Sequence, residues 1–99
     1  MAKTVFITGA TSGFGRATAK RFDAEGWQTI ITGRRGERLD SLKAELTNPC
    51  HSAILDVTKK DDVNALVEAL PAAFTPIDVL VNNAGLALGL EGADEVAMD

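Results

Sequence analysis

The stretch from Val5 to Gly15, VFITGATSGFG, constrains the fold more than any other part of the chain. A short apolar run ends in small residues, and a segment with helical periodicity follows, so the order is strand, turn, helix. Gly9, Gly13 and Gly15 lack a Cβ, which lets backbone N–H groups of the turn approach a bound group closely. The helix start adds about half a positive charge, so the turn favours a phosphate or pyrophosphate.

The spacing of these glycines, TGxxxGxG, matches neither the GxGxxG fingerprint nor the GxxxxGK[ST] loop. Three glycines in one turn are a weak signal by themselves. The alternative is a tight connection whose glycines only allow the helix and the strand to pack closely.

The composition of the chain limits the classes of protein to which it can belong. With 99 residues, 45% hydrophobic and 24% charged, the chain is expected to form one ordinary globular domain over residues 1–99. A net charge of −4 argues against nucleic acid or an anionic membrane as the main partner. No apolar run approaches the roughly 18 residues of a membrane span, and none resembles a signal peptide.

The single Cys50 suits a reducing compartment, so we expect a cytoplasmic protein. It has no second cysteine for a metal pair. Beside His51 it could be imagined as a nucleophile, but no further base or orienting group is identifiable. We therefore expect a partly buried residue in a loop or at a strand start.

Apolar residues alternate between helical and extended periods along the chain, which predicts four strands joined by three helices. Strands too apolar for an exposed face, joined by helices, call for a three-layer α/β fold with a doubly wound parallel sheet and right-handed crossovers. Strand order 3-2-1-4 follows if the first strand is central. The expected elements are a strand in the run that starts at Val5, a helix over residues 14–25 with Gly26 at its end, a strand over 28–32, a helix over 36–47, a strand over 52–55, a helix capped by Thr58 and ended by Pro71, a strand over 77–81, and a loop over 86–99.

Each predicted strand has polar or glycine-rich residues at its carboxyl end. These are Thr8–Gly15, Gly33–Arg35, Asp56–Val57 and Asn82–Gly85. A parallel sheet places the carboxyl ends of its strands on one rim, where open α/β sheets bind ligands. The sequence therefore predicts one site at this rim.

Arg34 and Arg35 follow the second strand, about twenty residues after the glycine turn, where an acid would favour NAD. Guanidinium groups instead suit the 2′-phosphate of NADP. The alternative is that the arginines only solvate a helix start, although cations there oppose the helix dipole.

Three further positions fit a dinucleotide. Asp56 could accept a hydrogen bond from the adenine amino group, or simply cap the turn that follows it, and Val57 could pack on the adenine ring. Asn82 could tie neighbouring strands together, whereas Asn83 could reach the ribose on the nicotinamide side.

Together these motifs resemble the short-chain dehydrogenase/reductase family: TGxxxGxG at Thr8–Gly15, the adenine contact at Asp56–Val57, and NNAG at Asn82–Gly85. Thr32–Leu39 and Asn82–Gly89 are similar to the NADP-dependent 3-hydroxy acid dehydrogenases of that family, whose substrates include serine, allo-threonine and 3-hydroxypropionate. The resemblance implies a Rossmann-type fold and NADP as cofactor. The cofactor contacts it implies are Gly9, Ala10, Thr11, Ser12, Gly13, Phe14, Gly15, Arg34, Arg35, Asp56, Val57 and Asn83.

In that family, hydride transfer needs a Ser, a Tyr and Lys in a YxxxK pair, and an Asn. This sequence contains no tyrosine, so no catalytic residue is assigned. The resemblance implies an NADP-dependent oxidoreductase of small 3-hydroxy acids, of which this chain is the cofactor-binding half, inactive alone. The alternative is a non-catalytic nucleotide-binding or self-associating module. In either case, the strand over Ile77–Val81 would lack an outer neighbour and, with Leu86–Leu90, form a homo-oligomer.

Overall fold

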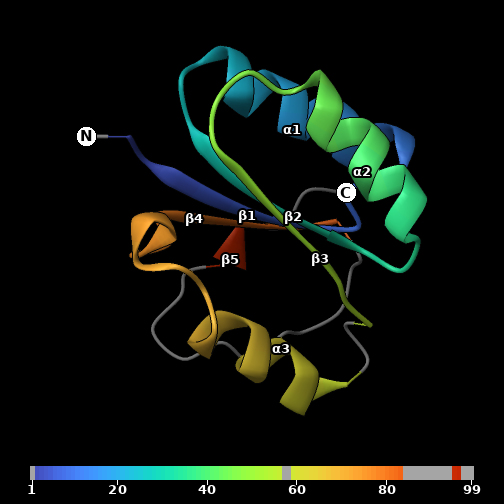
Figure 1. Cartoon of the computed structure of the whole chain (residues 1–99), viewed down its shortest axis with the longest axis vertical. Helices are drawn as coiled ribbons and strands as arrows, with labels where there is room; N and C mark the ends of the chain where they lie inside the picture. The colour runs from blue at the N-terminus through green and yellow to red at the C-terminus, as the bar shows by residue number, and fades with distance from the viewer. Residues whose placement is uncertain (1, 57–58, 84–94, 97–99) are drawn as a thin grey trace.

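The computed structural model of the protein describes residues 2–56, 59–83 and 95–96. Three α-helices and one short 3₁₀ helix connect the strands (Figure 1). The elements are β1 (Thr4–Thr8), α1 (Gly13–Ala24), β2 (Gln28–Gly33), α2 (Gly36–Glu45), β3 (Cys50–Ile54), α3 (Lys60–Glu68), η1 (Ala72–Phe74), β4 (Val79–Asn82) and β5 (Glu95–Val96).

The strands form one parallel sheet in the order β3-β2-β1-β4-β5. Helices α1 and α2 cover one face of this sheet and α3 lies on the other (Figure 1). In the central part, Phe6 of β1 lies between Ile30 of β2 and Leu80 of β4. The predicted order 3-2-1-4 and the layers on both faces are confirmed.

The outer edge of β4 differs from the prediction. Leu80 and Val81 pair with Glu95 and Val96 of β5, so the expectation that the fourth strand lacks an outer neighbour is wrong at these residues. A loop throughout 86–99 is also wrong, because a two-residue strand is too short for a periodic signal. The surface predicted at Leu86–Leu90 lies outside the described residues.

Helix α1 begins and ends with recognisable signals. The Ser12 hydroxyl caps its start by accepting a hydrogen bond from the Gly15 N–H at 3.1 Å. At its end, Gly26 has a φ of +89°, the left-handed conformation that glycine adopts readily after a helix.

Other boundaries shift by one or two residues. Helix α2 ends at Glu45 rather than at 47, and β3 begins at Cys50 rather than at 52, so Cys50 does start a strand. Helix α3 begins at Lys60 with Lys59 as its N-cap, and the predicted cap Thr58 lies outside the described residues. The shift at the end of α2 is of the size common at helix ends, where the last turn frays.

The core has one half on each face of the sheet, because successive side chains of a strand point to opposite faces. Val5 and Ile7 of β1 pack beneath α1 and α2 with Ala19, Leu39 and Leu42. On the other face the buried residues are Phe6, Ile30, Leu55, Val63, Leu70 and Leu80. Burial on both faces explains the continuous apolar runs Val5–Ile7 in β1 and Ile30–Ile31 in β2.

Candidate functional site

The turn after β1 is held by bonds to itself and to the neighbouring strand. Gly9 has a φ of +60°, which a side chain would disfavour. Its carbonyl accepts hydrogen bonds from the backbone N–H of Ser12 at 3.2 Å and from the Ser12 hydroxyl at 3.0 Å. The Ala10 N–H donates to the Thr32 carbonyl of β2 at 2.9 Å, so the turn is fixed to the sheet.

The start of α1 has unused hydrogen-bond donors. The N–H groups of Gly13 and Phe14 have no partner among the described residues, as expected for the first turn of a helix. No acidic residue occupies this turn, and the Phe14 side chain is 50% exposed. These donors and the helix dipole together favour the binding of an anion at the start of α1.

The glycines of the turn serve different purposes. A Cβ on Gly15 would lie 2.8 Å from the Asn83 Nδ2 and 2.9 Å from the Ala10 Cα, and closer still to the Gly9 carbonyl oxygen. Close packing therefore requires glycine there, as the alternative interpretation of the motif proposed. A Cβ on Gly13 would meet no atom of the described chain within 4 Å. Packing against the described residues therefore does not explain this glycine, which leaves open space in front of the helix among them.

Asn82 and Asn83 lie where β4 ends. The Thr8 hydroxyl donates to the Asn82 Oδ1 at 3.0 Å, so Asn82 ties β4 to β1, as predicted. Both amide atoms of Asn83 are buried and have no hydrogen-bond partner in the part of the chain that the structure describes. Leaving a buried polar group unpaired costs about 1–3 kcal/mol, which a polar ligand at the rim could recover.

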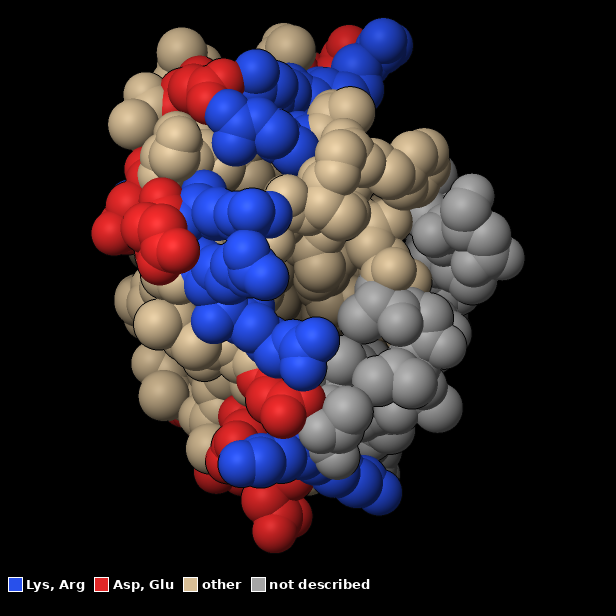
Figure 2. All heavy atoms as spheres, turned by 90° about the vertical axis from the view of Figure 1, so that its right-hand side faces the viewer, with Lys and Arg blue, Asp and Glu red and all other residues tan. Residues whose placement is uncertain are grey.

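Arg34 and Arg35 are exposed between β2 and α2, and Arg35 is the N-cap of α2. Neither forms an ion pair or side-chain hydrogen bond among the described residues. Arg16 and Arg21, by contrast, are paired with Glu45 and Glu25. Figure 2 faces the carboxyl ends of the strands and shows Lys and Arg side chains gathered in a column on this face.

The glycine turn and the end of β2 touch one another. A Cβ on Gly33 would lie 3.2 Å from the Thr11 Cγ2, so Thr11 packs on the residue just before Arg34. The Leu55 N–H donates to the Gly33 carbonyl at 2.8 Å, which places Asp56 beside the end of β2. The structure therefore brings the predicted positions of β1, β2, β3 and β4 to one rim, whereas Val57 lies outside the described residues.

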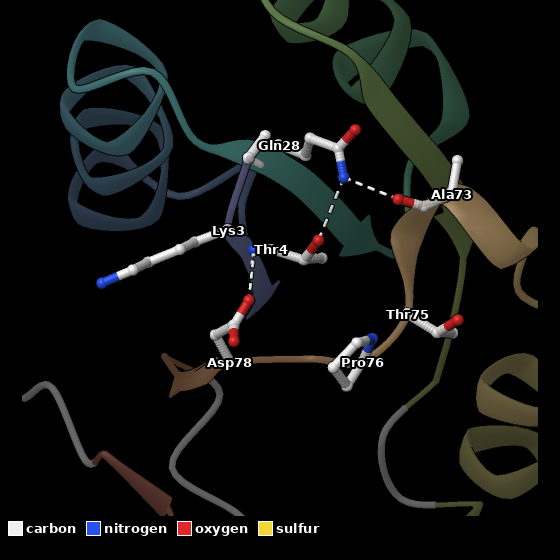
Figure 3. Close-up of a pocket in the computed structure, with 8 residues that line it drawn as sticks. Lys3, Thr4, Gln28, Ala73, Thr75, Pro76 and Asp78 are labelled. Carbon is white, nitrogen blue, oxygen red and sulfur yellow. Dashed lines mark hydrogen bonds between the residues drawn. The ribbon is translucent and has the colours of Figure 1, made fainter.

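A shallow pocket of about 380 Å³ lies at the opposite end of the sheet (Figure 3). Its polar groups are used within the chain. The Gln28 Nε2 donates to the Thr4 Oγ1 at 3.1 Å and to the Ala73 carbonyl at 2.7 Å, and the Thr4 N–H donates to the Asp78 carboxylate at 2.8 Å. The Lys3 side chain extends away from this group (Figure 3). These contacts join β1, β2 and η1, so we interpret the pocket as structural.

Cys50 is half-buried at the start of β3, away from the rim. Burial raises the pKa of its thiol, which reduces the thiolate fraction that a nucleophile needs. Among the described residues, no group of His, Cys, Asp and Glu could hold a metal ion. Within the same part of the chain, no helix has the length and apolar character needed to cross a membrane.

Residues 3–98 match the family model for short chain dehydrogenases. The chain is 55% identical over 98 residues to serine 3-dehydrogenase of Agrobacterium fabrum, covering 99% of this chain and 39% of that protein. It is 50% identical over 95 residues to an NADP-dependent 3-hydroxy acid dehydrogenase of Salmonella typhi, covering 96% of this chain and 38% of that protein. The closed form of a serine dehydrogenase complexed with NADP⁺ superposes with a TM-score of 0.77 at 45% identity, covering 81% of this chain and 32% of that one.

Proposed function

This chain belongs to the short-chain dehydrogenase family, and we propose that its rim binds NADP(H) as the cofactor-binding part of an NADP-dependent oxidoreductase. The open start of α1 carries this proposal, because Gly13 leaves a space that packing against the described part of the chain does not require. The match covers 99% of this chain but only 39% of the length of serine 3-dehydrogenase. From the names of its relatives, we propose a small 3-hydroxy acid as the substrate of the whole protein.

The residues at the rim fit the parts of NADP(H) one by one. The free N–H groups of Gly13 and Phe14 would bind the pyrophosphate, and the glycine turn from Gly9 to Gly15 would lie against it. The unpaired amide of Asn83 would bind a ribose. Asp56 would accept a hydrogen bond from the adenine amino group, with Val57 against the ring. The bound cofactor would supply or accept the hydride.

Arg34 and Arg35 would distinguish NADP(H) from NAD(H). Both are exposed, and neither is paired with a described acid, so both remain available for the 2′-phosphate. A hydrogen bond to a charged group contributes about 1.5–3 kcal/mol, which corresponds to roughly a tenfold to hundredfold difference in affinity. We therefore propose a clear preference for NADP(H).

We propose that these 99 residues bind the cofactor but do not transfer hydride by themselves. The resemblance to the family assigns the proton transfer to a tyrosine, and this chain contains none. We also propose a cytoplasmic location, because the lone Cys50 suits a reducing compartment.

A titration of the chain with NADPH and with NADH tests the proposal. We expect NADPH to bind at least tenfold more tightly, and the Arg34→Ala/Arg35→Ala double variant to bind both equally. Arg21→Ala is the matched control, because Arg21 is an exposed arginine paired with Glu25 on α1. If NADH binds as well as NADPH to the unmodified chain, the assignment of the arginines is wrong. If neither binds, the nucleotide site is wrong.

A further inference from the structure

Polar side chains join α1 to α2 and to the turn after it. Arg16 and Lys20 of α1 both pair with the Glu45 carboxylate at the end of α2, the Lys20 Nζ at 2.5 Å. One helical turn beyond Lys20, Asp23 binds the backbone that follows α2. The three α1 residues share one face of the helix, since they are spaced by four and three positions. We call Arg16, Lys20, Asp23, Glu45, Thr47 and Asn48 the α1–α2 seam.

Asp23 is the buried end of the seam, with 6% of its surface exposed. Its carboxylate accepts hydrogen bonds from the Asn48 N–H at 2.8 Å, the Thr47 N–H at 3.0 Å and the Thr47 hydroxyl at 3.1 Å. The Asn48 Nδ2 also donates to the Asp23 carbonyl at 2.6 Å. Burial alone would raise the pKa of Asp23, but these hydrogen bonds to Thr47 and Asn48 hold it below its ordinary value.

Both helices pack on the same face of the sheet, where Ala19 of α1 and Leu42 of α2 belong to one apolar cluster. The seam adds direct polar contacts between α1 and the end of α2. Helix α1 starts at the glycine turn, three residues before Arg16, and α2 starts directly after Arg35. A change in how the helices lie relative to one another would therefore change the separation between these two starts.

We propose that the α1–α2 seam sets the separation between the two phosphate sites of the rim, with Glu45 as a positioning residue. This inference rests on the proposed function, which places the pyrophosphate at the start of α1 and the 2′-phosphate at Arg34 and Arg35. A ligand that must reach both sites at once gains affinity only when their separation fits it. A ligand that uses one site does not depend on that separation.

Three ligands and the Glu45→Ala variant test the inference. Of the two phosphate sites, NADPH would use both, NADH would use only the start of α1, and adenosine 2′-monophosphate would use only the arginines. Because Glu45→Ala removes both ion pairs of the seam, which are partly exposed and individually weak, we expect NADPH to bind only about fivefold more weakly to this variant. The other two ligands should change less than about twofold, since neither spans the seam.

Glu25→Ala is the matched control, because Glu25 forms an ion pair with Arg21 inside α1 and not across the helices. It should leave the affinities for all three ligands unchanged. If Glu45→Ala fails to fold, Lys20→Ala removes one of the two cations and should show the same selective loss to a smaller degree.

The outcomes separate the two claims. Equal weakening of all three ligands would show that Glu45 only stabilises the fold, and an unchanged affinity for NADPH would show that the seam has no effect on the site. Either result overturns the inference and leaves the proposed function standing. Failure of the unmodified chain to bind NADPH would overturn both.

Discussion

Gly15→Ala should lower the stability of the fold, because other atoms already occupy the space that a side chain at this position would need. The added Cβ would lie 2.8 Å from the Asn83 Nδ2 and 2.9 Å from the Ala10 Cα, and closer still to the Gly9 carbonyl oxygen. Two of these neighbours are backbone atoms of a turn that is hydrogen-bonded to β2, so moving them would disrupt the turn. Overpacking of this kind typically costs about 1–3 kcal/mol. We expect a loss near the upper end of that range.

Gly13→Ala is the matched control, since its Cβ would meet no described atom within 4 Å. Alanine is favoured over glycine in a helix by up to about 1 kcal/mol, so this variant should be as stable as the parent or more stable. It should nevertheless bind NADPH more weakly, because the methyl group would project into the space proposed for the pyrophosphate.

Thermal unfolding followed by circular dichroism measures the difference. In a domain of this size 1 kcal/mol corresponds to about 4–8 °C, so a loss of about 3 kcal/mol should make Gly15→Ala melt roughly 12–24 °C below Gly13→Ala. Equal melting temperatures for the two variants would refute the argument that Gly15 is required by packing. Undiminished NADPH binding by Gly13→Ala would refute the argument that Gly13 provides space for a ligand.

Three further predictions concern other parts of the molecule. In isothermal titration calorimetry, Arg34→Ala and Arg35→Ala should each weaken the binding of NADPH roughly tenfold or more, because a hydrogen bond to a charged group is lost, and should leave the affinity for NADH unchanged. Equal losses of affinity for both nucleotides would contradict this. In urea unfolding, Asp23→Asn should cost about 2 kcal/mol at neutral pH. Because the pKa of Asp23 is lowered in the folded state, its contribution to the free energy of unfolding is complete above its unfolded pKa of about 3.9 and is lost as the pH falls through the folded pKa. A difference in stability between parent and variant that persists in stronger acid would contradict this prediction. Gln28→Leu should destabilise the chain by about 1–2 kcal/mol without changing NADPH affinity, since it removes two hydrogen bonds far from the rim; weaker binding would show that the opposite pocket affects the site.

The strand order and the location of the rim could be predicted because they follow from local patterns. Apolar runs and helical periods recur in alternation, and parallel strands must place their carboxyl ends together. The sequence alone therefore predicts that the positions from Gly9 to Gly15 lie on the same rim as Arg34 and Asn83. The predicted order 3-2-1-4 also places the fourth strand beside the first, which is why Asn82 can be expected to tie these two strands together.

Contacts between segments that are distant in the sequence leave no local pattern from which they could be predicted. Asp23 occupies an ordinary position on an amphipathic helix, and nothing near it in sequence indicates that it binds Thr47 and Asn48. The two residues of β5 are too few to show a period, which is why the edge of β4 was expected to be open. The unpaired amide of Asn83 and the different surroundings of Gly13 and Gly15 depend on side-chain packing in three dimensions, which spacing alone does not determine.

The proposed function requires a single nucleotide site at the carboxyl ends of the strands, and amide chemical-shift mapping with NADP⁺ would locate that site residue by residue. We predict that signals of Gly9–Gly15, Arg34, Arg35 and Asn83 move together and saturate at one concentration. Signals of Thr4, Gln28 and Asp78 at the opposite end should stay in place. Shifts confined to that opposite end, or none at any nucleotide concentration, would contradict the account.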